Sequence, residues 1–101
     1  MRVRWADEAE AHLDVWIDRL IDQDARLARR ARDEAKAAVE RLSTRFHIYR
    51  ASLRWSGFQE MPLQDWHKIV VYQVLPDEVI VAALFDMRQD LDLVHPTPES
   101  N

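Results

Sequence analysis

The stretch HKIVVYQVLPDEVIVAALFDMRQD, residues 67–90, constrains the fold of this chain more than any other part of its sequence. It holds two apolar, β-branched runs of strand length. The Leu75-Pro76-Asp77-Glu78 segment between them has proline at the position that a tight turn favours. Side chains alternate between the two faces of a strand, yet both faces of this predicted hairpin are apolar. A sheet with one face in water would carry a polar residue at every second position, so both faces of this hairpin need a cover.

Two predicted helices precede the hairpin and can cover one of its faces. Asp7 is the expected N-cap of the first helix, over residues 8–21, with Glu10 at the capping-box position. The second helix, over residues 25–43, has an apolar stripe composed mostly of alanine, which lets a neighbouring element approach closely. The break at residues 22–24 is short, so the two helices must form an antiparallel hairpin. The helical residues expected to be buried are Leu13, Trp16, Ile17, Leu20, Leu27, Ala31, Ala35 and Leu42.

Shorter segments complete the predicted fold. Residues 2–5 alternate polar and apolar side chains as a short strand does, and residues 58–63 form another strand after a turn or bulge at Gly57. With the hairpin strands at residues 66–74 and 79–85, the fold class is α+β, with an N-terminal short strand and an antiparallel helical hairpin packed on a small antiparallel β-sheet. The expected organisation is a single domain over residues 1–94 and a flexible polar tail over residues 95–101.

The second apolar face of the sheet has few residues left to cover it. We therefore expect a partly open apolar groove that binds another protein chain, because exposed apolar patches of this kind mark interfaces. The alternative is a cover made by residues 45–55 and the tail. The candidate partner-binding residues are Trp66, Val70, Tyr72, Val81, Ala83 and Phe85.

Composition excludes several classes of site. The 101 residues include no cysteine, which removes disulfides, thiolate catalysis and cysteine-based zinc sites. A single glycine leaves no glycine-rich phosphate loop, and the four histidines lack metal-ligand spacing, so neither a cofactor nor a metal is expected. The net charge of −4 counts against nucleic acid as the main partner. No apolar run approaches the ~20 residues that span a bilayer, and the N-terminus lacks a signal-peptide pattern, so a cytoplasmic protein without a membrane partner is expected.

The order of strand, two helices and three strands, closed by a charged turn, resembles the RelE/ParE toxin superfamily of bacterial type II toxin–antitoxin pairs. The resemblance rests on three stretches, which are ADEAEAHLDVWID, ARDEAKAAVERL and GFQEMPLQDWHKIVVYQVLPDEVIVAALFDMRQDL. Tyr72, Asp77, Arg88 and Asp90 fall on its best-kept positions. The chain departs from the pattern at His12, Gln59 and Asp86. In addition, RFHIYRASLRW, residues 45–55, occupies the place of a proline-glycine-arginine stretch.

The resemblance also separates two activities. RelE-like members cut messenger RNA on the ribosome with a basic cluster and a C-terminal tyrosine or histidine, whereas ParE-like members lack that set and are associated with poisoning of DNA gyrase. Here Ile69 stands where the nuclease branch has an arginine, Val94 lies near the tyrosine position, and His95 is one residue away. Cleavage needs a base and cations that hold the phosphate, so the resemblance implies a ParE-like toxin rather than a nuclease.

This implied toxin has a cognate antitoxin and DNA gyrase as its expected partners, and no direct contact with nucleic acid. The expected assembly is a homodimer or a toxin–antitoxin hetero-oligomer. Arg88 is the candidate functional residue, with a salt bridge to Asp86 or Asp90 as its structural alternative. Two other functions stay open: an inactive binding module of the same fold, and a ribosome-dependent nuclease. The cations that the nuclease would use are Arg45, Arg50, Arg54, Lys68 and Arg88, clustered around His67 or His95.

Overall fold

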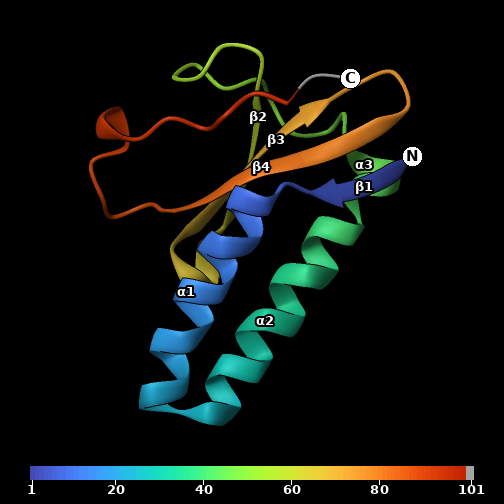
Figure 1. The fold of residues 1–101 in the computed structure, drawn as a ribbon. Helices are drawn as coiled ribbons and strands as arrows, with labels where there is room; N and C mark the ends of the chain where they lie inside the picture. The colour runs from blue at the N-terminus through green and yellow to red at the C-terminus, as the bar shows by residue number, and fades with distance from the viewer. Residues whose placement is uncertain (100–101) are drawn as a thin grey trace.

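Two long helices lie against one face of a four-stranded sheet in the computed structural model of the chain, which describes residues 1–99 (Figure 1). The elements in order are β1 (Arg2–Trp5), α1 (Asp7–Gln23), α2 (Ala25–Glu40), α3 (Leu42–Arg45), β2 (Gln59–Leu63), η1 (Gln64–Trp66), β3 (Lys68–Val74), β4 (Glu78–Asp86) and η2 (Leu91–Leu93). The helices form the predicted antiparallel hairpin, and its tip projects away from the sheet (Figure 1). The predicted α+β fold class is therefore confirmed.

The sheet has the strand order β1-β4-β3-β2. Strands β2, β3 and β4 are antiparallel neighbours, as predicted, but β1 pairs with β4 in parallel from Arg2 opposite Glu78 to Trp5 opposite Val81. Parallel neighbours need a long crossover connection, and here the rest of the fold supplies it. The buried Glu78 carboxylate accepts hydrogen bonds from Arg2 at 2.7 Å and Arg4 at 3.2 Å, which joins β1 to the start of β4. The sheet is thus mixed rather than wholly antiparallel.

The helix ends differ in detail from the predicted ones. Asp7 is the first residue of α1 rather than its N-cap, because Ala6 still donates its backbone N–H to Val81 in the sheet and occupies the cap position. Asp7 lies in an acidic first turn, which suits the positive end of the helix dipole. Asp24 caps α2, since its carboxylate accepts from the backbone N–H groups of Arg26 and Leu27. A separate short helix, α3, replaces the end of the predicted second helix.

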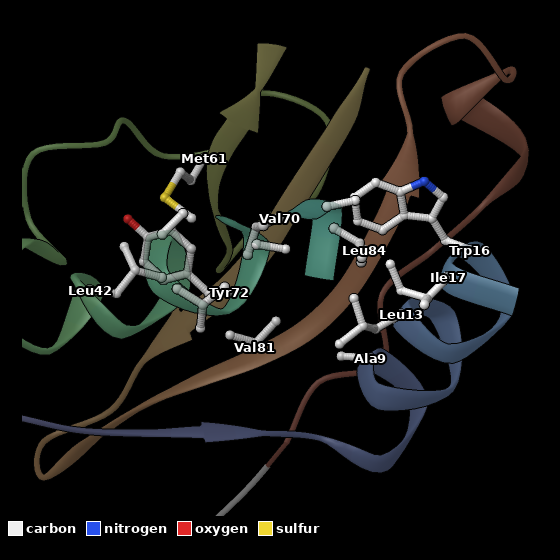
Figure 2. Packing of buried hydrophobic residues seen from close by; sticks show 14 of the residues in the cluster. Ala9, Leu13, Trp16, Ile17, Leu42, Met61, Val70, Tyr72, Val81 and Leu84 are labelled. Atoms are coloured by element: carbon white, nitrogen blue, oxygen red, sulfur yellow. The ribbon is translucent and has the colours of Figure 1, made fainter. Parts of the chain in front are cut away.

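The main core lies between the helices and the sheet (Figure 2). The alanine stripe of α2 is buried, with Ala31 and Ala35 fully enclosed, which allows α2 to lie close to its neighbours. Of the helical residues expected in the core, Leu20 and Leu27 are only partly buried, and the others are buried as predicted. On the sheet side, Figure 2 shows Val70, Tyr72, Val81 and Leu84 beneath the helices, and all four are buried.

A β-bulge at Ala82 changes which side chains share a face. Tyr72 is opposite Val81, but Val71 is opposite Ala83, so Ala82 is the extra residue on β4. Strict alternation along residues 79–85 predicts that the candidates Val81, Ala83 and Phe85 share one face, and that prediction is wrong. Val81 lies in the core beneath the helices, whereas Ala83 and Phe85 lie in a second apolar cluster on the outer face.

The outer face of the sheet is covered by the chain itself. Trp55 and Phe58 from the loop before β2 are buried against the sheet, and three partly buried residues after β4 pack on the same cluster. Figure 1 shows that loop and the C-terminal segment together on the side of the sheet away from the long helices. The expected open groove is therefore wrong. The alternative cover is correct only in part, because Trp55 comes from residues 45–55 while Phe58 and three residues between β4 and the tail supply the rest. The sheet residues of this outer cluster are Ile69, Val71, Ala82, Ala83 and Phe85.

Residues 95–99 of the predicted tail lie against the domain. Pro96 is buried, Thr97 donates to the Glu8 carboxylate at 2.7 Å, and the Glu99 backbone N–H donates to Gln73 at 2.8 Å. The end of the predicted tail, residues 100–101, lies outside the described residues. Among the helices of residues 1–99, none combines the length and the apolar character that crossing a membrane requires.

Candidate functional site

Arg88 lies on the turn that follows β4, with its side chain exposed and held by one carboxylate. Asp86 accepts from the Arg88 backbone N–H at 2.8 Å, from its Nε at 3.1 Å and from its Nη2 at 3.1 Å. These hydrogen bonds from Arg88, helped by the charge of Lys68, hold the pKa of Asp86 well below its usual range. The salt bridge considered as the structural alternative for Arg88 is therefore present, and it fixes the direction of the guanidinium.

Lys68 shares the same carboxylate from the neighbouring strand. Its Nζ lies 3.5 Å from Asp86 Oδ2 and 5.2 Å from the centre of the Trp16 ring. Burial lowers the pKa of Lys68, and the Asp86 charge opposes that effect. The Asp86 carboxylate thus pairs with two cations, so the group formed by Lys68, Asp86 and Arg88 keeps a net positive charge.

This ion cluster borders a cleft of about 270 Å³ between α1 and β4. His12 stands in its wall, where Nδ1 accepts the backbone N–H of Leu84 at 3.2 Å and the ring packs on Phe85 with 5.4 Å between ring centres. Burial lowers the pKa of His12, whereas Glu8, 3.9 Å from Nε2, favours its charged form. Because its Nδ1 lone pair is used, His12 is not free to act as a base from that nitrogen. The cleft is lined by His12, Val15, Trp16, Arg19, Lys68, Leu84, Phe85, Asp86, Gln89 and Val94.

Trp66 lies between the Trp16 ring and Arg30 of α2. Its ring meets Trp16 edge to face at 5.9 Å, and the Arg30 guanidinium lies 5.1 Å from the ring centre. Its indole N–H donates to Glu34 at 3.3 Å. Trp66 is only partly buried and lines a cleft of about 210 Å³ together with residues of α2. Among the six candidate partner-binding residues, it is the one that the folded chain leaves accessible.

The other five candidates are not at the surface. Val70, Tyr72, Val81 and Ala83 are fully buried, and Phe85 is 6% exposed. The Tyr72 hydroxyl donates to the Phe46 carbonyl at 2.8 Å, and burial raises its pKa to about 12. The prediction that these five residues lie on an open face of the sheet is wrong. The helices cover one side of the hairpin, and the loop before β2 and the C-terminal segment cover the other. Contact of these five residues with a partner would require that cover to move.

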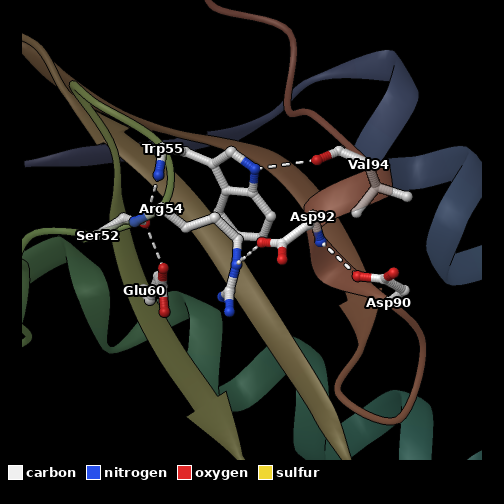
Figure 3. Close-up of polar contacts among 7 residues, drawn as sticks. All are labelled: Ser52, Arg54, Trp55, Glu60, Asp90, Asp92 and Val94. Carbon is white, nitrogen blue, oxygen red and sulfur yellow. Dashed lines mark hydrogen bonds and ion pairs between the residues drawn. The ribbon is translucent and has the colours of Figure 1, made fainter.

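The cations of the nuclease alternative separate into distinct groups. Lys68 and Arg88 meet at Asp86, whereas Arg50 and Arg54 line a cleft of about 440 Å³ beside the loop before β2. Arg54 is paired with Asp92 at 3.3 Å in that cleft (Figure 3). His67 and His95 line neither this cleft nor the cleft of about 270 Å³ between α1 and β4. Within residues 1–99, no group of three histidine, aspartate or glutamate side chains is placed to hold a metal ion.

Sequence reasoning missed the pairing of Lys68 with Asp86. Counting back from the turn pairs Val74 with Val79 and would place Phe85 opposite Lys68, but the bulge at Ala82 moves Asp86 into that position. The available signal was a cation at the start of the first predicted hairpin strand and a carboxylate just after the end of the second, because these positions lie near each other in a hairpin. The hydrogen bond from Leu84 to His12 joins residues 72 positions apart, and the sequence carried no sign of it.

Comparisons with known proteins agree with this architecture. A family model described as the ParE toxin of the type II toxin–antitoxin system parDE matches residues 3–91. A solved structure from the chromosomal ParDE system of P. aeruginosa superimposes with a TM-score of 0.78 at 18% sequence identity, covering 87% of this chain and 97% of that chain. A search of curated proteins gave no match. The structural likeness shows the fold, and the family match extends over nearly the whole domain, so the chain belongs to the ParE toxin family of type II toxin–antitoxin systems.

Proposed function

We propose that this chain is a toxin that binds and inhibits DNA gyrase and that a cognate antitoxin neutralises it. Membership of the ParE family supports the toxin role and the expectation of an antitoxin. The observation that favours protein binding over RNA cleavage is the engagement of both Arg88 and Lys68 by Asp86. In this proposal the chain acts on gyrase, and the antitoxin acts on the chain, by binding rather than by catalysis.

The chemistry of RNA cleavage argues in the same direction. A nuclease of this kind needs a base for the 2′-hydroxyl and cations that are free to receive a phosphate. Here Asp86 cancels one of the two positive charges that Lys68 and Arg88 would offer to a phosphate, and His12 uses Nδ1 to accept a backbone N–H. Ile69, at the expected arginine position, is buried in the outer apolar cluster, and Val94, near the expected tyrosine position, packs on the same cluster.

Arg88 is the residue that we expect to contact the target. It follows the central strand β4, and Asp86 accepts two hydrogen bonds from its guanidinium and one from its backbone N–H, while the side chain stays 68% exposed. A cation fixed in this way loses little conformational entropy when it meets a carboxylate of a partner. The proposal places the protein in the cytoplasm, as a hetero-oligomer with the antitoxin while it is neutralised. A homodimer is the alternative assembly. Light scattering of the purified chain, measured alone and then with the antitoxin, distinguishes the homodimer from the hetero-oligomer.

Supercoiling of relaxed plasmid by purified gyrase and ATP tests the target. The protein should inhibit this reaction, and Arg88→Ala should raise the concentration needed for half inhibition about 10-fold, as loss of an interface arginine does. Arg26→Ala, an exposed arginine of α2, is the control and should inhibit like the unmodified protein.

A parallel reaction with translating ribosomes examines a defined message for cleavage. Message cleavage that disappears in Arg88→Ala, without any effect on gyrase, would reject the gyrase proposal and support the RelE-type nuclease. No effect in either reaction, combined with tight binding to the antitoxin, would support the inactive binding module.

A further inference from the structure

The loop before β2 presents two large apolar side chains to solvent. Leu53 is 94% exposed and Ile48 is 55% exposed, and both belong to the segment 45–55 where the sequence departs from the superfamily pattern. Single exposed apolar residues are ordinary on protein surfaces, so exposure alone does not indicate a contact site. The way in which the fold holds Leu53 in this position is more informative.

The residues on either side of Leu53 in the sequence are held by hydrogen bonds (Figure 3). The Ser52 hydroxyl oxygen accepts the backbone N–H groups of Arg54 at 3.1 Å and Trp55 at 2.9 Å, and the hydroxyl donates to Glu60. Trp55 is buried and donates its indole N–H to the Val94 carbonyl at 3.0 Å. The exposure of Leu53 is therefore set by a turn whose backbone is held by hydrogen bonds, and such a backbone loses little conformational entropy on binding.

The preceding part of the loop is fixed as well. Gln59 donates its side-chain amide to the carbonyls of Phe46 at 3.1 Å and Tyr49 at 2.8 Å, and the Tyr72 hydroxyl also donates to Phe46. Ile48 lies between these two anchored residues. Both exposed apolar side chains of the loop are thus displayed by backbone that the sheet holds in place.

Charge distinguishes this loop from the rest of the chain. Residues 45–57 contain three arginines and no acidic residue, although the whole chain has a net charge of −4. Arg54 is paired with Asp92, but within residues 1–99 no carboxylate lies within ion-pair distance of Arg50. Arg50 is exposed and is therefore available to an acidic group of a partner.

Arg50 stands between two clefts that each contain one of the exposed apolar residues. One cleft, of about 440 Å³, is lined by Leu53, Arg54 and Asp92, and the other, of about 460 Å³, is lined by Ile48, Tyr49 and Pro62, while Arg50 and Glu60 line both. An acidic side chain at Arg50 would bring apolar neighbours on either side of it to Leu53 and Ile48. The pattern that fits is an acidic residue flanked by apolar ones.

The edge of β2 does not offer a place for an added strand. The Glu60 backbone N–H already donates to the Arg50 carbonyl at 3.4 Å, and Pro62 has no N–H to donate. Two exposed apolar side chains, Leu53 and Ile48, give nothing to a nucleic-acid backbone, which cations hold. These features favour a protein partner that is recognised through its side chains.

We propose that the loop surface formed by Ile48, Arg50 and Leu53 binds an acidic, apolar segment of the cognate antitoxin and helps to determine which antitoxin this toxin accepts. This inference rests on the proposed function, because it takes the antitoxin as the occupant. The charge of Arg50 supplies selectivity for an acidic segment, and the exposed Leu53 supplies apolar contact area.

The experiment measures binding of this chain to the full-length protein encoded by the adjacent reading frame, by calorimetry at low and high salt. Leu53→Ser and Arg50→Glu should each raise Kd at least 10-fold, and the penalty of Arg50→Glu should shrink as salt screens the charge. Matched controls are Ile21→Ser, also an exposed apolar residue at 51%, and Arg26→Glu, both at the far tip of the helical hairpin. The controls should bind as the unmodified chain does, and thermal unfolding should show all four variants folded.

Unchanged affinity of both loop variants would overturn the inference while leaving the proposed function in place. No binding of the unmodified chain to that protein would overturn both together. Self-association of the free chain that Leu53→Ser abolishes, measured by light scattering, would instead identify a second copy as the occupant. Binding of a short single-stranded RNA that Arg50→Glu abolishes would reject a protein partner.

Discussion

A single imidazole joins helix α1 to the edge of the central strand β4. Strand β1 pairs with β4 only as far as Val81, so the Leu84 backbone N–H has no strand beside it on that edge. His12 Nδ1 accepts this N–H at 3.2 Å, which requires the neutral tautomer with its proton on Nε2. A charged imidazolium has a proton on both nitrogens and could not accept the hydrogen bond.

His12 should make the stability of the fold depend on pH. Burial lowers its pKa from the ordinary value of 6.5, with Glu8 raising it and Lys68 lowering it to smaller extents. The unfolded chain therefore binds more protons as the pH falls below 6.5, so stability is complete above that value and declines below it. We expect the free energy of unfolding, measured with urea, to fall by about 1 kcal/mol as the hydrogen bond is lost.

The substitution His12→Asn places an amide oxygen near the Nδ1 position without a titrating group, so its unfolding free energy should be flatter between pH 6.5 and 5. His47→Asn changes an exposed histidine and should keep the pH dependence of the unmodified protein. An identical decline in His12→Asn would show that another group is responsible.

At the scale of elements, the close packing of α2 depends on its small residues. Ala31 and Ala35 have no exposed surface, and both belong to the cluster shared with α1 and the sheet. Interiors of this density have no room for added methylene groups, so the helix can keep its position only while these residues stay small.

Replacement of a buried alanine by leucine should therefore destabilise the fold. We expect Ala35→Leu to lower the free energy of unfolding by about 1–3 kcal/mol, because the larger side chain must push α2 away from its neighbours. Ala37→Leu makes the same change at an exposed position of the same helix and should stay within about 0.5 kcal/mol of the unmodified protein. Equal effects of the two substitutions in urea titrations would contradict tight packing along the Ala35 face.

At the scale of the whole molecule, the sheet separates two apolar clusters with different covers. The helices cover one cluster, and a loop together with the C-terminal segment covers the other. Trp55 joins the two parts of the outer cover, since it packs on Phe85 with 5.3 Å between ring centres and donates to Val94 in the C-terminal segment. Loss of this one side chain should loosen both parts together.

Two substitutions separate the packing of Trp55 from its hydrogen bond. Trp55→Ala should lower the free energy of unfolding by about 3–5 kcal/mol through lost burial, whereas Trp55→Phe keeps an aromatic ring and should cost about 1–2 kcal/mol. Hydrogen exchange at residues 91–94 should accelerate in both variants. Trp66→Phe alters a partly exposed indole and should leave that exchange unchanged. Slow exchange at residues 91–94 in Trp55→Phe would show that the hydrogen bond does not hold the segment.

The elements of this fold could be predicted from the sequence because their signals are local. The period of the apolar residues depends on neighbours two to four positions apart, and it located the helical hairpin, the tight turn at residues 75–78 and the strands on either side. Apolar residues on both faces of β3 and β4 also required two covers, and both exist. The functional role of Arg88 stays a prediction, whereas its bond to Asp86, the alternative role, is present in the structure.

The identity of the outer cover, the placement of β1 and the surroundings of the candidate site were decided only by the tertiary structure. Trp55 reaches Val94 across 39 positions, Arg2 reaches Glu78 across 76, and no local period reports contacts between such distant residues. The bulge at Ala82 had the widest effect, because one extra residue in β4 reversed the faces of every side chain after it. It moved Ala83 and Phe85 to the outer cluster and brought Asp86 opposite Lys68, and the local alternation of apolar residues does not mark where an extra residue enters a strand.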